Sequence, residues 1–162
     1  MERKTALYPG TFDPITNGHL DIVKRVSKIF DTVIVAIAES AHKNPLLSLE
    51  QRYEIAEKSL RDMEGVKCIT FTGLLVEEFK KNKVDVVIRG LRAISDFEYE
   101  LMITLMNRKL EPDFETVFLM PSEEYIYLHS SLVKEIYRMG GRIDCHVPEP
   151  VKEGLNKWFP RT

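Results

Sequence analysis

The sequence predicts an α/β fold with a doubly wound, five-stranded parallel sheet, formed by residues 1–162 as a single domain. Short apolar segments alternate with segments of helical periodicity, which is typical of strand–helix–strand units with right-handed crossovers. The segment Thr32–Ala38 is apolar without polar alternation, which indicates a strand buried on both faces. No internal repeat, low-complexity run or linker divides the chain.

The first half of the chain is expected to contain three strands, at Lys4–Tyr8, Thr32–Ala38 and around Val66–Phe71. Between the first two lies a helix, Gly18–Phe30, whose apolar residues recur at helical spacing. The sequence Ser-Leu-Glu-Gln that starts at Ser48 is a capping box, so a second helix should begin there and extend to about Met63.

The second half continues the alternation and ends in two helices. A proline stops the last strand, a Gly-Gly pair ends the helix that follows it, and two prolines precede the final helix. The helices from about residue 130 onward are expected to pack on the core. The expected elements are a short helix at Leu74–Lys81, a strand at Val84–Ile88, a long helix capped by Ser95 or Asp96 and reaching Leu110, a strand at Thr116–Met120, a helix at Ser130–Met139, and a last helix that contains Trp158.

Composition limits the function classes. The chain is 44% hydrophobic and 30% charged, as in ordinary globular proteins, and its net charge of −2 predicts neither a nucleic-acid nor a membrane partner. The N-terminal apolar stretch is too short for a signal peptide, so the cytoplasm is the expected location. Cys68 and Cys145 lack metal or redox spacing and are interpreted as reduced thiols of the core.

The segment from Tyr8 to His19 joins the first strand directly to the first helix. Unpaired N–H groups and the positive end of the helix dipole meet at such a junction, which favours anions. It is neither a Walker loop, since no Lys-Ser/Thr follows the glycines, nor a dinucleotide fingerprint, since Gly10 and Gly18 are too far apart. We expect a phosphate site there, with the imidazole of His19 as an added donor.

Polar residues also follow the other strands, and parallel strands deliver such residues to one cleft at the carboxyl edge of the sheet. Lys43 follows the second strand, Arg89-Gly90-Leu91-Arg92 follows the fourth, and Ser130-Ser131 opens a helix after the fifth. Arginine forks grip phosphate oxygens in pairs, and Gly90 would allow close backbone approach. The set predicts two anionic ligands, a nucleotide and a second phosphorylated compound.

No nucleophile elbow, catalytic Ser-His-Asp order or His/Cys metal cluster stands in these loops. A phosphomonoester is already an anion at neutral pH and can attack a nucleotide α-phosphate without a general base. The residues therefore favour a transferase that acts by positioning and charge stabilisation.

Thr16-Asn17-Gly18-His19 resembles the T-x-G-H form of the nucleotidyltransferase signature, and Pro9 to His19 is similar to the form found in bacterial phosphopantetheine adenylyltransferases. The segments 88–100, 106–107, 117–122 and 130–135 resemble that family in the same order. The resemblance implies a Rossmann-like nucleotidyltransferase fold and transfer of AMP from Mg·ATP to 4′-phosphopantetheine, giving dephospho-coenzyme A and pyrophosphate. It also implies a cytoplasmic homohexamer, Mg²⁺ that arrives with ATP, no dedicated metal ligands, and coenzyme A as a feedback ligand.

The resemblance also assigns residues. His19, Thr11, Lys43 and Arg92 would be the catalytic group, with His19 stabilising charge on the α-phosphoryl group. Thr11, with His19, would contact the phosphates at the reacting centre and also counts among the substrate-binding residues. Lys43 and Arg89 would hold the acceptor phosphate, and Leu75 would line the pantetheine arm. His129 departs from the family, where a Ser-Ser-Ser run is common. The residues expected at ATP are Thr11, Phe12, His19, Gly90, Leu91, Arg92, Glu100, Tyr125, Ile126, Tyr127, Leu128, His129, Ser130 and Ser131.

Each of these residues also has a purely structural interpretation. Lys43 could be a solvated loop charge, and Ser130 and Ser131 could simply be helix N-caps. Arg89 and Arg92 could form surface ion pairs with Asp96 or Glu98. Two other functions stay open as well, a nucleotidyltransferase for a different phosphorylated acceptor and a nucleotide sensor without catalytic activity.

Overall fold

The structure, a computed structural model, describes residues 3–40 and 43–160. Five parallel strands form one sheet in the order β3-β2-β1-β4-β5. Strand order reverses at β1, which pairs with β2 on one side and β4 on the other. The doubly wound parallel sheet is therefore confirmed. The strands are β1 (Thr5–Gly10), β2 (Thr32–Ala38), β3 (Val66–Phe71), β4 (Val86–Gly90) and β5 (Thr116–Leu119).

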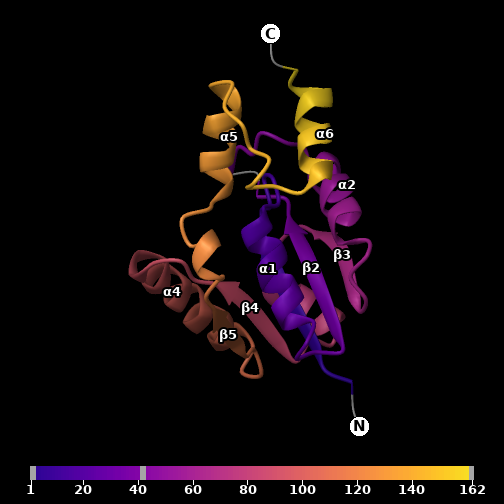
Figure 1. Cartoon of the computed structure of the whole chain (residues 1–162). Helices are drawn as coiled ribbons and strands as arrows, with labels where there is room; N and C mark the ends of the chain where they lie inside the picture. The colour runs from indigo at the N-terminus through magenta and orange to yellow at the C-terminus, as the bar shows by residue number, and fades with distance from the viewer. Residues whose placement is uncertain (1–2, 41–42, 161–162) are drawn as a thin grey trace.

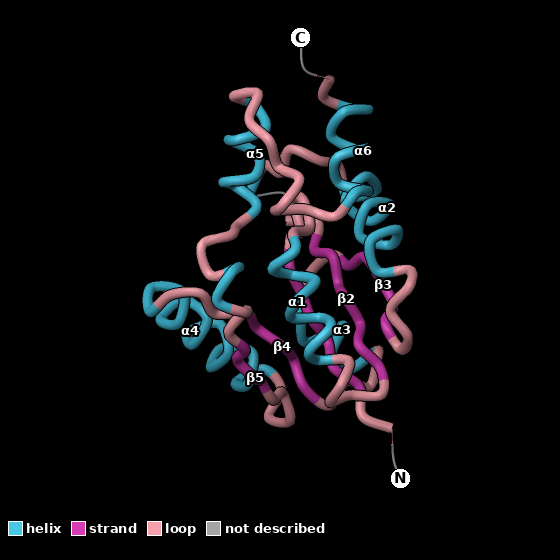
Figure 2. Tube along the Cα trace, in the orientation of Figure 1, coloured by secondary structure: helices cyan, strands magenta, loops and turns pink. Residues whose placement is uncertain are grey.

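Helices cover both faces of the sheet (Figures 1 and 2). One face packs against α1, α2, α5 and α6, and α5 and α6 also extend past the carboxyl ends of the strands. The other face packs against α3. The helices are α1 (Asn17–Val26), α2 (Leu49–Leu60), α3 (Leu75–Lys81), α4 (Ile94–Leu110), α5 (Ser130–Arg138) and α6 (Glu149–Trp158).

Strand β2 shows why its sequence lacks polar alternation. Val33, Val35 and Ile37 point into the larger core with α1 and α2, whereas Ile34 and Ala36 point into the smaller core with α3. All five side chains are fully buried. Burial of this kind on both faces supplies the main hydrophobic stabilisation of the central strands, at roughly 25 cal/mol per Å² of apolar surface removed from water.

Several predicted boundaries differ from the observed ones. α1 ends at Val26 rather than Phe30, because Ser27 begins a turn in which Phe30 N–H still donates to Val26 O. β4 begins two residues later than predicted and continues through Arg89 and Gly90, because β5 offers backbone partners at Phe118 and Leu119. A 3₁₀ turn at Glu123–Tyr125 was not predicted.

The predicted cap of α4 is wrong. Ala93 is the N-cap and provides no side-chain hydrogen bond, while Asp96 lies inside the helix and accepts from Arg92 N–H at 3.2 Å. The cysteine prediction holds only in part. Both are free thiols, and Cys68 packs against the core, but Cys145 is exposed. Among the described residues, no helix is long and apolar enough to cross a membrane.

Candidate active site

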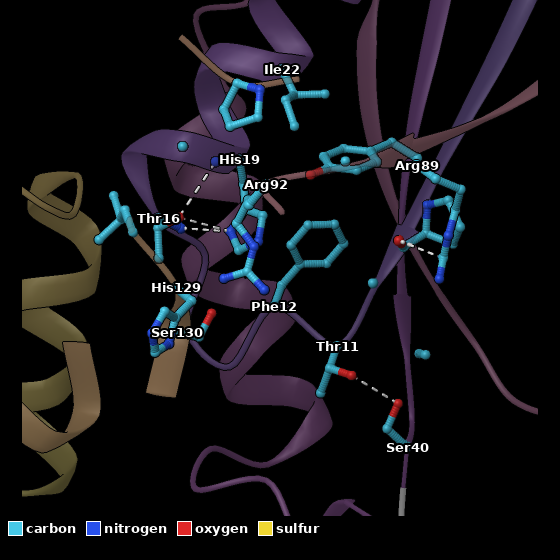
Figure 3. A pocket seen from close by; sticks show the side chains of 18 of the residues that line it. Thr11, Phe12, Thr16, His19, Ile22, Ser40, Arg89, Arg92, His129 and Ser130 are labelled. Atoms are coloured by element: carbon cyan, nitrogen blue, oxygen red, sulfur yellow. Dashed lines mark hydrogen bonds between the residues drawn. The ribbon is translucent and has the colours of Figure 1, made fainter. Parts of the chain in front are cut away.

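A cleft of about 420 Å³ lies at the carboxyl ends of β1, β2 and β4, beside the start of α5. This is the edge where strand order reverses, and its volume lies in the range of ligand pockets. Figure 3 shows side chains from several of these segments around it. The predicted site residues that line it are Thr11, Phe12, His19, Lys43, Leu75, Arg89, Gly90, Arg92, Glu100, Tyr125, Leu128, His129, Ser130 and Ser131.

The β1–α1 junction forms one wall of the cleft. Phe12 has a φ of 48° and is buried, with its ring edge against His19 at a centroid distance of 5.0 Å. A Cβ at Gly10 would lie 2.9 Å from that ring, so glycine is needed for Phe12 to fold back over the strand end. The aromatic ring thus supports one side of the imidazole.

His19 is the third residue of α1 and part of a reciprocal capping box with Thr16. Thr16 Oγ1 accepts from His19 N–H, and His19 Nδ1 accepts from Thr16 N–H at 3.0 Å. Since an amide can only donate, Nδ1 is the unprotonated nitrogen and Nε2 carries the proton of the neutral ring. Burial, helped by the charge of Arg92, lowers the pKa of His19 to about 4. The ring is therefore a neutral Nε2–H donor at pH 7.

The two arginines of the β4–α4 segment are held by different carboxylates. Arg89 forms two hydrogen bonds to Glu100, from Nε at 2.5 Å and from Nη2 at 2.8 Å. Arg92 pairs with Asp96 at 3.2 Å. The ion-pair interpretation thus holds for Arg92 and Asp96, but Glu98 is not the partner of Arg89. Both guanidinium groups also line the cleft, so pairing fixes their orientation there.

Thr11 and Lys43 lie on the side of the cleft nearest β2. Thr11 Oγ1 and Ser40 Oγ are 3.1 Å apart, which joins the loop after β1 to the loop after β2 (Figure 3). Lys43 is exposed, and no carboxylate in the described ranges 3–40 and 43–160 lies within ion-pair distance of it. Its ammonium group is available to an anionic ligand.

The start of α5 forms the opposite wall. His129, and not Ser130 or Ser131, is the N-cap of α5, and its Nδ1 accepts from Leu132 N–H at 3.2 Å. The alternative interpretation of the two serines as the N-caps is therefore wrong. Ser130 Oγ instead donates to Pro14 O at 2.7 Å, which ties α5 to the β1–α1 loop. The imidazole of His129 is thus the side-chain cap of α5.

Three predicted ATP contacts, Leu91, Ile126 and Tyr127, are not among the residues that line the cleft. Leu91 N–H donates to Leu119 O and continues the pairing of β4 with β5. Tyr127 is exposed, with its ring edge against His146. Gly90 does line the cleft, but a Cβ there would lie 2.8 Å from Ile22 Cδ1. β4 thus packs closely on α1 at this glycine, and a larger residue would displace the end of the Ile22 side chain.

Other residues of the cleft were missed by the sequence analysis. Ser40 lies in the same polar loop as Lys43, and this position was the signal that could have found it. Ile22 and Phe71 were assigned only to a helix and a strand, yet both residues also line the cleft. No cluster of three or more His, Cys, Asp or Glu side chains that could hold a metal occurs in the part of the chain that the structure describes.

Comparison with known proteins shows the family to which this chain belongs. Residues 7–136 match the model of the cytidylyltransferase-like family. A solved structure from Vibrio parahaemolyticus, assigned as a nicotinate-nucleotide adenylyltransferase, superposes with a TM-score of 0.74 over 96% of this chain and 93% of that one, at 16% identity. At this identity the likeness concerns the fold alone.

Curated relatives are much closer in sequence. Phosphopantetheine adenylyltransferase of Thermodesulfovibrio yellowstonii is 50% identical over 159 residues, covering 98% of this chain and 99% of the relative. The enzymes of that name from Dictyoglomus turgidum and Campylobacter jejuni are each 53% identical, over 95% and 91% of this chain and 96% and 93% of their own lengths. The chain belongs to the cytidylyltransferase-like family and, within it, to the phosphopantetheine adenylyltransferases.

Proposed function

We propose that this protein transfers the adenylyl group of ATP to 4′-phosphopantetheine, giving dephospho-coenzyme A and pyrophosphate, in the cytoplasm. The observation that carries the proposal is the cleft that is lined by a neutral His19 at the start of α1, by two oriented arginines and by Lys43. Relatives about half identical over nearly the whole chain carry the name of this activity. The two alternative functions are a nucleotidyltransferase for a different phosphorylated acceptor and a nucleotide sensor without catalytic activity.

In the proposed reaction, an oxygen of the acceptor phosphate attacks the α-phosphorus of ATP as the bond from that phosphorus to the bridging oxygen breaks. Pyrophosphate leaves with the electron pair, and no proton needs to be removed from the acceptor at neutral pH. The protein must align the two phosphates and stabilise the charge that develops between them.

His19 is proposed to donate its Nε2–H to an α-phosphate oxygen, beside the N–H groups and dipole of α1. Arg92 and the Gly90 turn would hold the nucleotide phosphates. Thr11, Lys43 and Arg89 would hold the acceptor phosphate, and Leu75 at the start of α3 would line its pantetheine arm. The wall from Tyr125 to Ser131 would bind the nucleoside.

Mg²⁺ is proposed to enter with ATP as part of the substrate. Glu100 is the acidic side chain that lines the described cleft, and both of its oxygens accept from Arg89. Mg²⁺ usually keeps several waters and binds substrate phosphates rather than a protein cage. No residue of the chain is assigned to the ion.

A homohexamer is part of the proposal, and α4 supplies its support. Tyr99, Met102, Leu105 and Met106 are more than half exposed on this helix, far more apolar surface than a solvated helix normally shows. We propose that second copies of this chain cover it. Coenzyme A, which shares the pantetheine arm of the product, is the proposed feedback ligand of the same cleft.

The decisive experiment incubates the protein with ATP, Mg²⁺ and 4′-phosphopantetheine and detects pyrophosphate. Nicotinamide mononucleotide is the competing acceptor. Pyrophosphate with 4′-phosphopantetheine alone supports the proposal. Release with the mononucleotide alone would assign the protein to another acceptor, and ATP binding without release with either acceptor would indicate a sensor.

A further inference from the structure

Arg52 is a fully buried arginine, with a relative exposure of 2%, in the first turn of α2. Its guanidinium group makes four hydrogen bonds, all to backbone carbonyls. Nε donates to Leu47 O at 3.2 Å, Nη1 to Thr11 O at 2.7 Å and Ala38 O at 2.6 Å, and Nη2 to Glu39 O at 3.0 Å. Arg52 is not among the residues that line the cleft.

The four carbonyls belong to segments that are distant in sequence but meet at the cleft. Thr11 is in the loop after β1, Ala38 is the last residue of β2 and Glu39 follows it, and Leu47 immediately precedes Ser48, the N-cap of α2. The loop between Glu39 and Leu47 carries Lys43. Arg52 therefore holds both ends of that loop and joins its first end to Thr11.

A second buried charge holds the far end of the same loop. Asp13 is 5% exposed and accepts from Leu46 N–H and Leu47 N–H, each at 2.9 Å. It also pairs with Lys134 of α5. Burial lowers the pKa of Arg52, and the negative charge of Asp13 opposes this shift. The loop is thus anchored by Arg52 at both ends and by Asp13 at its end before α2.

Burying an arginine is costly, because desolvation must be offset by well-placed partners. An apolar side chain would fill the same space without this cost, but it could not bind four carbonyls. The planar guanidinium has five N–H donors in a fixed fork, whereas lysine offers three donors from one point. The geometry of this side chain matters more here than its charge.

We propose that Arg52 is a positioning residue that fixes the Lys43 loop against Thr11 and thereby sets the affinity for the phosphorylated acceptor. The proposal rests on the function proposed above, in which Lys43 binds the acceptor phosphate. Arg52 itself touches neither substrate. Its effect reaches the acceptor through the backbone at Thr11, Ala38 and Glu39.

The test is Arg52→Lys, made in the wild-type protein and in Lys43→Ala. In the wild type, the KM for 4′-phosphopantetheine should rise about tenfold while the KM for ATP stays within about twofold. In the Lys43→Ala background, the same substitution should raise the acceptor KM less than about threefold, because residues that act as a unit are not additive. Full additivity, an equal rise in both KM values or an unchanged KM would overturn the proposal.

Two variants of the same helix serve as controls. Arg61→Lys changes an exposed arginine at the end of α2 and should alter neither KM. Leu60→Ala removes a core side chain that is 3% exposed, so it should lower the stability without raising the acceptor KM. A rise in acceptor KM with Leu60→Ala would show that general loosening of α2 is the cause.

Failure of the proposed function gives a different result. If Lys43→Ala alone leaves the acceptor KM unchanged, the assignment of Lys43 to the acceptor phosphate is wrong, whatever Arg52 does. Arg52→Gln, whose amide can donate to two of the four carbonyls, is the second variant if Arg52→Lys does not fold. If neither variant folds, Arg52 is needed for the stability of the whole protein, and the proposal that it acts only by positioning the Lys43 loop is overturned.

Discussion

At the start of α1, the two ring nitrogens of His19 have different tasks. Nδ1 accepts from Thr16 N–H and caps the helix, so Nε2 holds the proton. The low pKa, about 4, keeps the ring neutral at physiological pH. The cleft already has the positive charges of Arg89, Arg92 and Lys43, and a neutral donor adds no further charge. This suits the proposed anionic ligands, because products that are bound too tightly would be released slowly.

Replacing His19 with alanine should lower kcat about a hundredfold or more, the scale for losing one preorganised donor to a developing charge. Steady-state kinetics with both substrates saturating is the measurement. Gln51→Ala is a matched control, since Gln51 is the equivalent third residue of the α2 capping box and its loss removes a similar hydrogen bond. An unchanged kcat in His19→Ala would remove the imidazole from the reaction.

The same imidazole should make stability depend on pH. In the unfolded chain the imidazole binds a proton once the pH falls below about 6.5, whereas the folded ring binds it only near its pKa of about 4. The free energy of unfolding therefore falls as the pH falls from about 6.5 to about 4. Between pH 7 and 5 the loss due to His19 should be about 2 kcal/mol. Urea unfolding of the wild type and His19→Gln at both pH values measures it, and equal losses in the two proteins would contradict the shift.

Arg89→Ala tests the allocation of the two phosphates. The KM for the phosphorylated acceptor should rise tenfold or more, roughly the effect of losing a charge-assisted pair of hydrogen bonds, while the KM for ATP changes little. The control is Arg142→Ala, an exposed arginine paired with Asp144 outside the cleft. If only the KM for ATP rose, Arg89 would bind the nucleotide phosphates and not the acceptor phosphate, and the proposed roles of Arg89 and Arg92 would have to be exchanged.

At the scale of elements, α1 holds two other segments in place. Asp21 accepts from Ser122 N–H at 2.8 Å and Ser122 Oγ at 2.9 Å, and Arg25 Nη1 donates to Met120 O at 2.6 Å. These contacts fix the segment after β5, where Pro121 and Tyr125 line the cleft. The helix that carries His19 thus also sets the proposed nucleotide wall.

Asp21→Ala should therefore raise the KM for ATP about five- to tenfold, on the scale of one or two hydrogen bonds of roughly 1 kcal/mol. The acceptor KM should be nearly unchanged. Asp31→Ala is the comparison, because Asp31 accepts from Lys4 N–H at the opposite end of the sheet and its loss should affect stability only. Equal effects of the two substitutions on the ATP KM would refute a local role for Asp21.

At the scale of the whole molecule, most residues of the cleft come from elements other than α4, the helix that carries a group of exposed apolar side chains. The cleft lies at the carboxyl edge of β1, β2 and β4. Several exposed apolar side chains belong to α4. This helix lies beside β4 and β5 (Figure 1). Glu100 links the two regions, since it belongs to α4 and orients Arg89 in the cleft. Assembly through α4 would therefore stabilise the helix that holds Arg89.

Met106→Glu tests this arrangement. Met106 is 66% exposed, and a charge at a buried contact between copies should dissociate the assembly into smaller species in sedimentation velocity. Met139→Glu, at a 79% exposed position at the end of α5, should leave the assembly intact. A monomeric wild type, or the same sedimentation for wild type and Met106→Glu, would contradict an interface at α4.

Much of the fold could be predicted because its signals are local. The bounds of β2 and β3 match the predicted ones, and the capping box at Ser48 begins α2 as expected. Other ends were misplaced. β1 runs to Gly10 rather than Tyr8, and the ends of α1 and β4 depend on a turn and on strand pairing, which apolar periodicity does not report. Most residues proposed for the site do line the cleft, because loops after parallel strands meet at one edge of the sheet.

The sequence by itself determined the alternation of strands and helices, the direct junction of β1 and α1 between Tyr8 and His19, and the family, since these depend on residues close together in the chain. Only the tertiary structure decided the partner of each charge. Glu100 rather than Glu98 orients Arg89, and Arg52, which the sequence places on an ordinary helix, is buried beneath two loops. Such pairings depend on how distant segments pack, and no local periodicity contains that information.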